Sequence, residues 1–185
     1  MEEVIKIEGG KLLEGNIKVS GAKNATVALI PACVLATDIV KIVGIPNISD
    51  VRSLKEILEY MNVKVTTPSL DSKLSEPTEM VNKPIVIDAV SKLRASYYFM
   101  GGLLGKYKKV IIRMPGGCNL GPRPIDLHLK GFKALGADIQ YQDDNYIISA
   151  DTLVGTKIYL DIASVGATIT IIMAAVYAQG ETTIE

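Results

Sequence analysis

The sequence of 185 residues has little of several residue types. It has no tryptophan, one histidine and two cysteines, and aromatic residues make up only 5% of it. Basic and acidic residues are equal in number, 20 each, so the formal net charge is zero. This balance predicts no bulk attraction to nucleic acid or to an acidic membrane surface. One histidine and two distant cysteines form no metal-ligand cluster, and no nucleotide-binding glycine signature is present, so neither a metal nor a cofactor is expected.

Long apolar runs are missing as well. The most apolar window, Ala167–Ala178, is too short to span a membrane, and we expect it to form a buried helix. The first residues contain no basic region followed by an apolar run, so no signal peptide is expected. The cytoplasm is therefore the expected location, and a disulfide between Cys33 and Cys118 is not expected. Cys33 lies within an apolar helical pattern and is predicted to be a small core residue.

An internal repeat is the main organising feature of the chain. Hydrophobic residues make up 48% of the sequence, and its length is enough for one domain with a sizeable core. Three segments, which begin near Ser20, Lys92 and Ser164, share the order of a polar or glycine turn, an apolar helix and a β-rich strand. A shift of 74 residues aligns Val51 with Ile125 in the helices that follow. Each repeat therefore predicts alternating strands and helices.

The third repeat stops at Glu185, before its second helix. The polar segment 67–83 carries prolines and is expected to be an exposed, mobile excursion. The expected helices span 27–36, 50–60, 97–104, 124–135 and 169–178, and the expected strands span 16–19, 40–43, 63–65, 85–88, 110–112, 137–141, 146–148, 157–161 and 182–184.

A loop rich in glycine and proline carries the second cysteine. Residues 113–124 read Arg-Met-Pro-Gly-Gly-Cys-Asn-Leu-Gly-Pro-Arg-Pro, so Cys118 lies between Arg113 and Arg123. Nearby positive charge stabilises a thiolate, and glycines allow a ligand to approach the backbone closely. The guanidinium of Arg123 can hold a carboxylate or a phosphate through two hydrogen bonds. The pattern favours a reactive thiol beside an anion site, although a plain strand-to-helix crossover remains the alternative.

Two cations stand at equivalent helix starts. Lys23, followed by Asn24, opens the first helix, and Arg94 takes the corresponding position in the second repeat. A helix N-terminus has free N–H groups and the positive end of the helix dipole. A cation there weakens the helix. A residue that breaks a local rule in this way often marks a functional site, so the position favours an anion site. The alternatives are a surface lysine with Asn24 as a cap, and a solvated arginine.

His128 lies at the start of the helix that follows the cysteine loop. It can form a catalytic dyad with Cys118, or it can cap the helix or bind a ligand. The residue types alone leave these three roles open.

Together these motifs resemble one family. The Ser-Gly-Ala-Lys-Asn and Leu-Arg-Ala-Ser helix starts, the run Pro-Gly-Gly-Cys-x-x-Gly-x-Arg-Pro-x-Asp-Leu-His and the Ser-Val-Gly-Ala-Thr turn are similar to those of the UDP-N-acetylglucosamine 1-carboxyvinyltransferases. These are the enolpyruvyl transferases that begin peptidoglycan synthesis, and the resemblance covers the whole chain. It implies an α/β fold: an inside-out barrel domain of repeated βαβαββ units with helices packed inward, here with an incomplete third repeat.

The resemblance also implies a reaction. The enolpyruvyl group would pass from phosphoenolpyruvate to the 3-hydroxyl of UDP-N-acetylglucosamine, with release of phosphate. Cys118 would donate a proton, form a covalent adduct with phosphoenolpyruvate and be the residue alkylated by fosfomycin, while Lys23 and Arg123 would hold the phosphate. The implied substrate-binding residues are Lys23, Asn24, Arg94, Arg123, Pro124, Ile125, Asp126, Leu127, His128, Ser164, Val165 and Gly166.

The resemblance implies a domain division with a part left out. Residues 1–19 would form a strand that packs into a second domain, and residues 20–185 would be an incomplete catalytic N-terminal domain. The second domain, absent here, would supply the base for the sugar hydroxyl, so the chain alone is expected to have little or no turnover. Ile162 replaces a lysine that the family often has. The alternatives are a truncated, non-catalytic domain that binds the two substrates and, less favoured, a 3-phosphoshikimate 1-carboxyvinyltransferase, because that relative lacks the cysteine loop.

Overall fold

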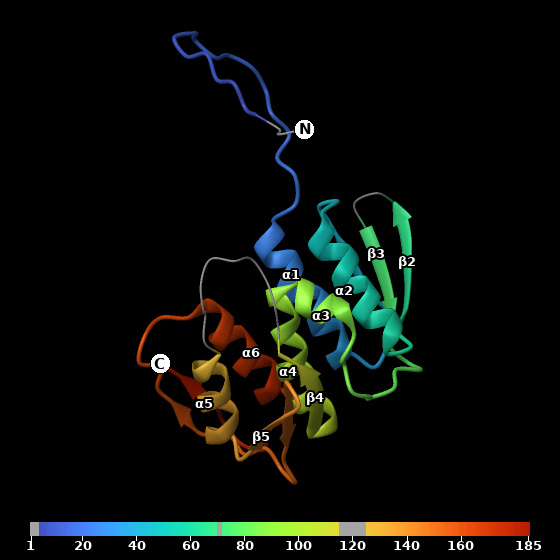
Figure 1. The fold of residues 1–185 in the computed structure, drawn as a ribbon, viewed down its shortest axis with the longest axis vertical. Coiled ribbons are helices and arrows are strands. Elements are labelled where there is room, and N and C mark those ends of the chain that lie inside the picture. Colours follow the sequence, from blue (N-terminus) through green and yellow to red (C-terminus); the bar gives the residue numbers. More distant parts are fainter. Residues whose placement is uncertain (1–3, 70–71, 115–124) are drawn as a thin grey trace.

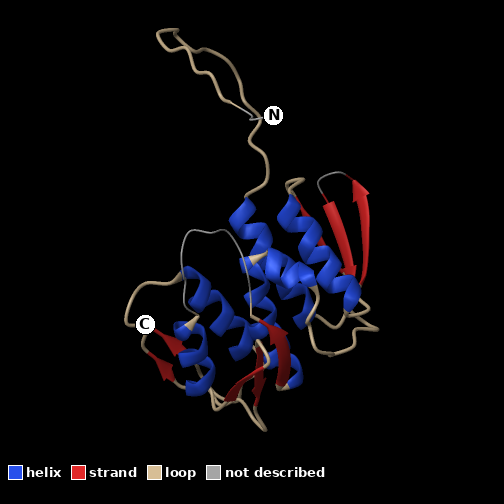
Figure 2. Cartoon of the chain, in the orientation of Figure 1, coloured by secondary structure: helices blue, strands red, loops and turns tan. Residues whose placement is uncertain are grey.

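The computed structural model describes residues 4–69, 72–114 and 125–185. Helices pack on one another in the middle of the molecule, and three small sheets lie around them (Figures 1 and 2). Residues 4–19 form neither helix nor strand and extend away from this body (Figure 1). The strand expected at 16–19 is therefore absent. Its apolar residues Ile17 and Val19 are 91% and 86% exposed, so this segment has no packing surface to hold an extended conformation.

The first repeat forms a helical pair and a three-stranded antiparallel sheet. β3 lies between the other two strands, with Lys41 opposite Leu74 on one side and Thr66 opposite Leu74 on the other. The expectation of an exposed excursion at 67–83 is wrong, because this segment contains the central strand β3. The elements are α1 (Lys23–Ala32), the 3₁₀ turn η1 (Cys33–Leu35), β1 (Val40–Val43), α2 (Ser49–Tyr60), β2 (Lys64–Ser69) and β3 (Ser72–Glu76).

The second repeat has the same plan with an extra short helix at its start. Its sheet is antiparallel in the order β4-β6-β5, and the strand expected at 85–88 is reduced to a single bridge between Ile85 and Ile112. The elements are α3 (Asp88–Lys92), the 3₁₀ turn η2 (Arg94–Tyr97), α4 (Tyr98–Tyr107), β4 (Lys109–Arg113), α5 (Asp126–Ala134), β5 (Asp138–Gln142) and β6 (Asn145–Ser149).

The third repeat is a short parallel pair of strands around one helix: β7 (Lys157–Ile158), α6 (Val165–Ala175) and β8 (Thr183–Ile184). The strand expected at 157–161 is thus only two residues long. The second repeat has the βαβαββ order, with its first strand reduced to a single bridge. The first repeat has the same order but lacks the leading strand. The α/β class and the central position of the helices agree with the expected fold, and the closure into a barrel stays a prediction.

The first long helices of the three repeats lie side by side. α4 packs against both α1 and α6, and one hydrophobic core joins them. A Cβ atom at Gly101 would overlap the backbone oxygen of Thr170, and one at Gly105 would lie 2.7 Å from that of Met173. Only glycine permits this spacing between α4 and α6, so the two helices pack closely at Gly101.

Side chains also connect the C-terminal ends of these helices. The Nζ atom of Lys106 donates hydrogen bonds to the carbonyl oxygens of Val34 (2.8 Å) and Ala36 (2.6 Å), and the hydroxyl of Tyr177 donates to that of Leu35 (2.7 Å). Because the C-terminal ends meet and the helices lie side by side, their N-terminal ends lie together at the opposite end of the bundle.

α6 is only partly buried, although we expected a buried helix at 167–178. Ala167 and Ile171 are in the core, whereas Ile172 and Val176 are 49% and 59% exposed. Within the described ranges, no helix is long and apolar enough to cross a membrane.

Candidate functional site

The N-terminal ends of the helices bring together residues that are far apart in the sequence. α1 contacts η2, and α5 contacts α6. The hydroxyl of Tyr97, in η2, lies so close to Gly166, in the first turn of α6, that a Cβ atom there would be 2.6 Å from it. The Cε1 atom of His128, in α5, would be 3.5 Å from the same Cβ. Gly166 is therefore the point where η2, α5 and α6 meet.

Lys23 is the first residue of α1 and carries an ion pair. Its Nζ atom lies 2.7 Å from Oδ2 of Asp50, which is in the first turn of α2. The lysine side chain is 58% exposed, so solvent and ligands can reach it. Asn24, next in the helix, is exposed too. The cation at this helix start is thus accessible, but it already has a carboxylate partner.

Arg94 and His128 both lie close to the ring of Tyr97. The guanidinium carbon of Arg94 lies 5.8 Å from the ring centre of Tyr97, and the Tyr97 and His128 ring centres are 4.5 Å apart. The Tyr98 ring centre lies 4.6 Å from that of Tyr97, and both ring pairs are tilted. The aromatic cluster Tyr97–Tyr98–His128 therefore joins η2, α4 and α5 beside the start of α6.

The hydrogen bonds of His128 determine its tautomer. The hydroxyl of Thr170 donates to the carbonyl oxygen of Gly166 at 2.8 Å, which uses its only proton. The same hydroxyl oxygen lies 3.1 Å from Nδ1 of His128, so Nδ1 must be the donor of that bond. The neutral ring then carries its proton on Nδ1, and Nε2 is left as a hydrogen-bond acceptor.

His128 is also held in its neutral form. Its side chain is only 4% exposed. Burial, and then the positive charge of Arg94, lower the pKa of His128 to about 4, while the Asp126 carboxylate opposes this shift. At neutral pH the ring is uncharged and serves as a hydrogen-bonding group. A role as a general base toward Cys118 would require it to take up a proton that this environment disfavours.

Ser164 caps α6. Its Oγ atom accepts a hydrogen bond from the backbone N–H of Ala167 at 3.3 Å, which satisfies one of the free donors of the first turn. Val165 is 76% exposed, and Gly166 is partly exposed. The first turn of α6 therefore presents backbone N–H groups and the positive end of the helix dipole at the same end of the bundle as Lys23.

The structure places the predicted site residues in two groups. Arg94, His128 and Gly166 come together around Tyr97, and Ile125 to Leu127 form the start of α5 next to His128. Lys23 and Asn24 lie on α1, which packs against η2. Cys118, Arg123 and Pro124 fall outside the described residues, and so does the cysteine loop predicted around them.

Sequence reasoning misses Asp50, Tyr97 and Thr170 as parts of this region. The sequence pattern indicates Asp50 only as a helix start, and Thr170 lies 42 residues from its partner His128. Tyr97 follows directly after the Leu-Arg-Ala-Ser motif that contains Arg94, so its place beside that motif is the one available signal.

Other predictions concern Cys33, metals and Ile162. Cys33 is 2% exposed, and its Sγ atom donates to the Leu29 carbonyl oxygen at 3.5 Å, which confirms a core role. Burial raises the pKa of this thiol, so it stays protonated. Among the residues that the structure describes, no three histidine, cysteine, aspartate or glutamate side chains are grouped to hold a metal ion. Ile162 is 68% exposed on the loop before α6.

Two curated relatives of similar sequence carry the same name. The chain is 53% identical over 183 residues to UDP-N-acetylglucosamine 1-carboxyvinyltransferase 2 of Bacillus anthracis, covering 99% of this chain and 43% of the relative. It is 51% identical over 185 residues to the protein of that name from Staphylococcus aureus (strain MW2), covering 100% of this chain and 44% of the relative. The chain thus spans less than half the length of these curated relatives.

Solved structures with the same fold are more distant in sequence. The enolpyruvyl transferase NikO from Streptomyces tendae aligns with a TM-score of 0.79 at 19% identity, covering 96% of this chain and 42% of that chain. EPSP synthase from Acinetobacter baumannii aligns with a TM-score of 0.73 at 19% identity, covering 92% of this chain and 40% of that chain. These likenesses support the α/β fold of the enolpyruvyl transferases.

A family model also matches the chain. The model described as EPSP synthase (3-phosphoshikimate 1-carboxyvinyltransferase) matches residues 7–185, which is nearly the whole chain. The resemblance to enolpyruvyl transferases that the sequence motifs indicate is therefore confirmed. The chain belongs to the enolpyruvyl transferase family that this EPSP synthase model describes.

Proposed function

We propose that the chain forms one part of an enzyme that transfers the enolpyruvyl group of phosphoenolpyruvate to the 3-hydroxyl of UDP-N-acetylglucosamine. Phosphate is released, and the reaction begins peptidoglycan synthesis in the cytoplasm. The observation that carries this proposal is the 53% identity, over 99% of the chain, to a protein whose name states this activity. The proposal includes no metal and no cofactor.

The charge distribution of the site supports the choice of substrates. Phosphoenolpyruvate and a UDP-sugar are both anionic, and each needs cations or backbone N–H groups as partners. Lys23 is accessible at the start of α1, and Arg94 lies at the start of η2, which packs against it. In the proposal these two residues, with Arg123, bind phosphoenolpyruvate, and Asn24 lines the same place.

The UDP-sugar is proposed to bind at the adjoining helix starts. Pro124 to His128 and Ser164 to Gly166 would contact it, because the starts of α5 and α6 meet at Gly166. The N–H groups in the first turn of α6 suit a diphosphate. The neutral His128 would contribute the acceptor Nε2, which favours an N–H or O–H group of the ligand over a phosphate oxygen.

Cys118 is proposed to take part in the chemistry. The sugar hydroxyl oxygen forms a bond to C2 of phosphoenolpyruvate while a proton is added to the methylene carbon C3. The bond from C2 to the phosphate oxygen then breaks, and a proton leaves C3 to restore the double bond. Cys118 would supply the proton to C3, and cations around the phosphate would stabilise the charge that develops on it.

The remaining length of the relatives is proposed to supply the groups that this chain lacks. A second domain would bring the base for the sugar hydroxyl, and residues 1–19 would pack into it. The support is the apolar character of the extended segment, in which Ile5 and Leu12 are 92% and 96% exposed. Alone, the chain is expected to bind substrates with little or no turnover, so phosphate release at an enzymatic rate would contradict this domain division.

The 3-phosphoshikimate reaction is the second candidate, because the family model carries that description. The EPSP synthase structure from Acinetobacter baumannii is only 19% identical to this chain and shows the fold alone. The higher identity to the UDP-N-acetylglucosamine enzymes favours the first reaction.

A ligand-binding experiment separates these functions. The ¹⁵N-labelled chain is titrated with UDP-N-acetylglucosamine and, in parallel, with 3-phosphoshikimate, and amide shifts are followed by NMR. We expect saturable shifts of Val165, Gly166 and Leu127 with the UDP-sugar only, because the proposed site lies at those helix starts. Val165→Pro, which removes one backbone N–H in the first turn of α6, is expected to weaken binding severalfold. Shifts produced by 3-phosphoshikimate alone would overturn the proposal.

A further inference from the structure

The ion pair between Lys23 and Asp50 is unequal in its surroundings. The Asp50 side chain is 19% exposed, whereas that of Lys23 is 58% exposed. The carboxylate is therefore the sheltered partner, and the ammonium group reaches toward solvent. Two of the three ammonium protons remain available to a second acceptor, since Asp50 takes one.

Asp50 is fixed in place more firmly than Lys23. It lies in the first turn of α2, whose N-cap residue Ile48 makes no side-chain capping bond, so the carboxylate is favoured by the free N–H groups and by the helix dipole. The hydroxyl of Ser49 lies 3.4 Å from its other oxygen, Oδ1. Lys23, by contrast, stands at the positive end of α1, where no acidic residue of its own first turn balances it.

The backbone keeps the two helix starts together. A Cβ atom at Gly21 would overlap the carbonyl oxygen of Gly44 and would lie 3.3 Å from Cδ of Pro46. Glycine at position 21 thus lets the turn before α1 touch the loop that leads into α2. The backbone at Lys23 and the backbone at Asp50 are consequently held near each other by the fold.

We propose that Asp50 is a built-in counter-ion that positions Lys23 and competes with the phosphate group of phosphoenolpyruvate for it. This inference rests on the proposed function, because it needs Lys23 to bind that phosphate. A phosphate dianion bound to the Lys23 ammonium group would lie a few ångströms from the Asp50 carboxylate. Electrostatic repulsion at such a distance in a water-like dielectric changes the affinity for phosphoenolpyruvate by up to about tenfold. The exposed pair itself contributes less than this to stability. Asp50 therefore lowers phosphate affinity, which favours release of the phosphate product.

Replacement of the carboxylate by an amide tests the inference. Asp50→Asn keeps the size of the side chain and removes its charge. We expect the variant chain to bind phosphoenolpyruvate about three- to tenfold more tightly than the unchanged chain, measured by calorimetric or NMR titration at low ionic strength. Asp50→Glu restores the charge and should return the affinity toward its original value, which a purely structural role for Asp50 would not predict.

A double-mutant cycle with Lys23→Gln supplies the control. Lys23→Gln should weaken binding, and the effect of Asp50→Asn should change in its presence, because the carboxylate then has no ammonium group to compete for. Thermal unfolding of each variant checks that the fold is intact.

The outcomes separate the two proposals. If Lys23→Gln weakens binding but Asp50→Asn leaves it unchanged or weaker, the counter-ion role is overturned and the proposed function stands. If the unchanged chain does not bind phosphoenolpyruvate, or if Lys23→Gln has no effect, the role of Lys23 in the proposed function fails, and this inference fails with it.

Discussion

His128 shows how one buried residue acquires its chemical state from three neighbours. The Thr170 hydroxyl accepts from its Nδ1, the Tyr97 ring packs against it at a tilt, and the charge of Arg94 opposes its protonation. A sequence predicts a histidine at this helix start but not its state, because Thr170 and Arg94 reach it through tertiary packing. The same limit applies to Lys23, whose partner Asp50 comes from a different helix.

The low pKa of His128 predicts an acid-dependent loss of stability. The folded-state pKa, about 4, is below the ordinary value of 6.5, so the unfolded chain binds the proton first. The stabilisation is complete above pH 6.5 and is lost as the pH falls toward 4, by at most about 3 kcal/mol of unfolding free energy. Urea unfolding at about pH 7 and about pH 4.5 measures it, and His128→Gln should show a smaller loss.

The chain has no other histidine, so its ring signal in proton NMR gives a direct check. A titration midpoint near the ordinary value of 6.5 would contradict the described surroundings of His128. Thr170→Val is the companion variant, because it removes the acceptor for Nδ1 and should change the ¹⁵N shifts of the ring.

At the scale of elements, the contact between α4 and α6 depends on glycine. Gly101 and Gly105 lie one helical turn apart and bring the α4 backbone against that of α6. Both helices lack strong amphipathic patterns, because each is apolar on most of its surface. Their pairing is therefore determined by shape more than by the position of a polar face.

Gly101→Ala is expected to destabilise the chain by about 2–3 kcal/mol, measured by urea unfolding. The added methyl group would overlap a backbone oxygen of α6, which cannot move without shifting the helix. Gly15→Ala is the matched control, since a Cβ atom there meets nothing within 4 Å. Equal unfolding midpoints for the two variants would show that α4 and α6 are not packed as described.

Sequence patterns predict some elements closely and others poorly: β1 has its expected bounds, whereas α1 and α6 begin four residues before the helices expected at 27–36 and 169–178. α2 and α5 follow from apolar residues at helical spacing, and their observed bounds, Ser49–Tyr60 and Asp126–Ala134, differ from the expected ones by one or two residues. β3 is not predicted because Ser72–Glu76 contains few strand-forming side chains and is held by main-chain bonds to two neighbours. α3 is not predicted because five residues are too few to show a period.

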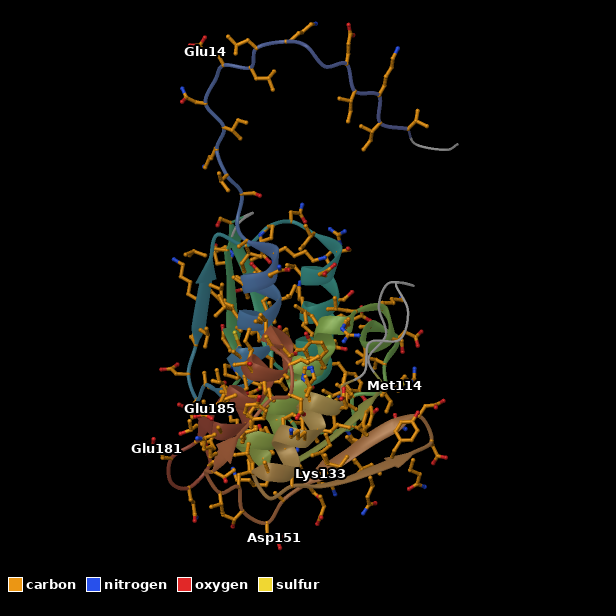
Figure 3. The ribbon with its side chains drawn as sticks, turned by 90° about the vertical axis from the view of Figure 1, so that its left-hand side faces the viewer. Glu14, Met114, Lys133, Asp151, Glu181 and Glu185 are labelled. Carbon is orange, nitrogen blue, oxygen red and sulfur yellow. The ribbon has the colours of Figure 1, made fainter. Side chains whose placement is uncertain are left out.

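At the scale of the whole molecule, α6 has an apolar stripe that the described residues do not cover. Val165, Ile172 and Val176 are spaced by seven and four residues, so they share one face of the helix, and each is about half exposed or more. Figure 3 views the molecule from the side and shows Glu181 and Glu185, which follow this helix, toward the lower left of the body. A helix that is apolar all round is usually buried on every side.

The exposed stripe predicts self-association of the chain at high protein concentration. We expect the apparent mass from light scattering to rise with concentration and with salt, because the contact is apolar. The double variant Ile172→Lys with Val176→Glu should reduce this rise, while Val81→Lys, at a residue that is 46% exposed outside α6, should not. A mass that stays at that of a single chain throughout would contradict the prediction.

The hydrogen bond from the Tyr177 hydroxyl to the Leu35 carbonyl oxygen joins residues 142 positions apart. It links the end of the last helix to the turn that closes the first. During synthesis on a ribosome, the first helix emerges long before Tyr177 does. The first repeat must therefore wait until Tyr177 has been synthesised before its helix end gains this partner, so the repeats do not complete their folding one by one.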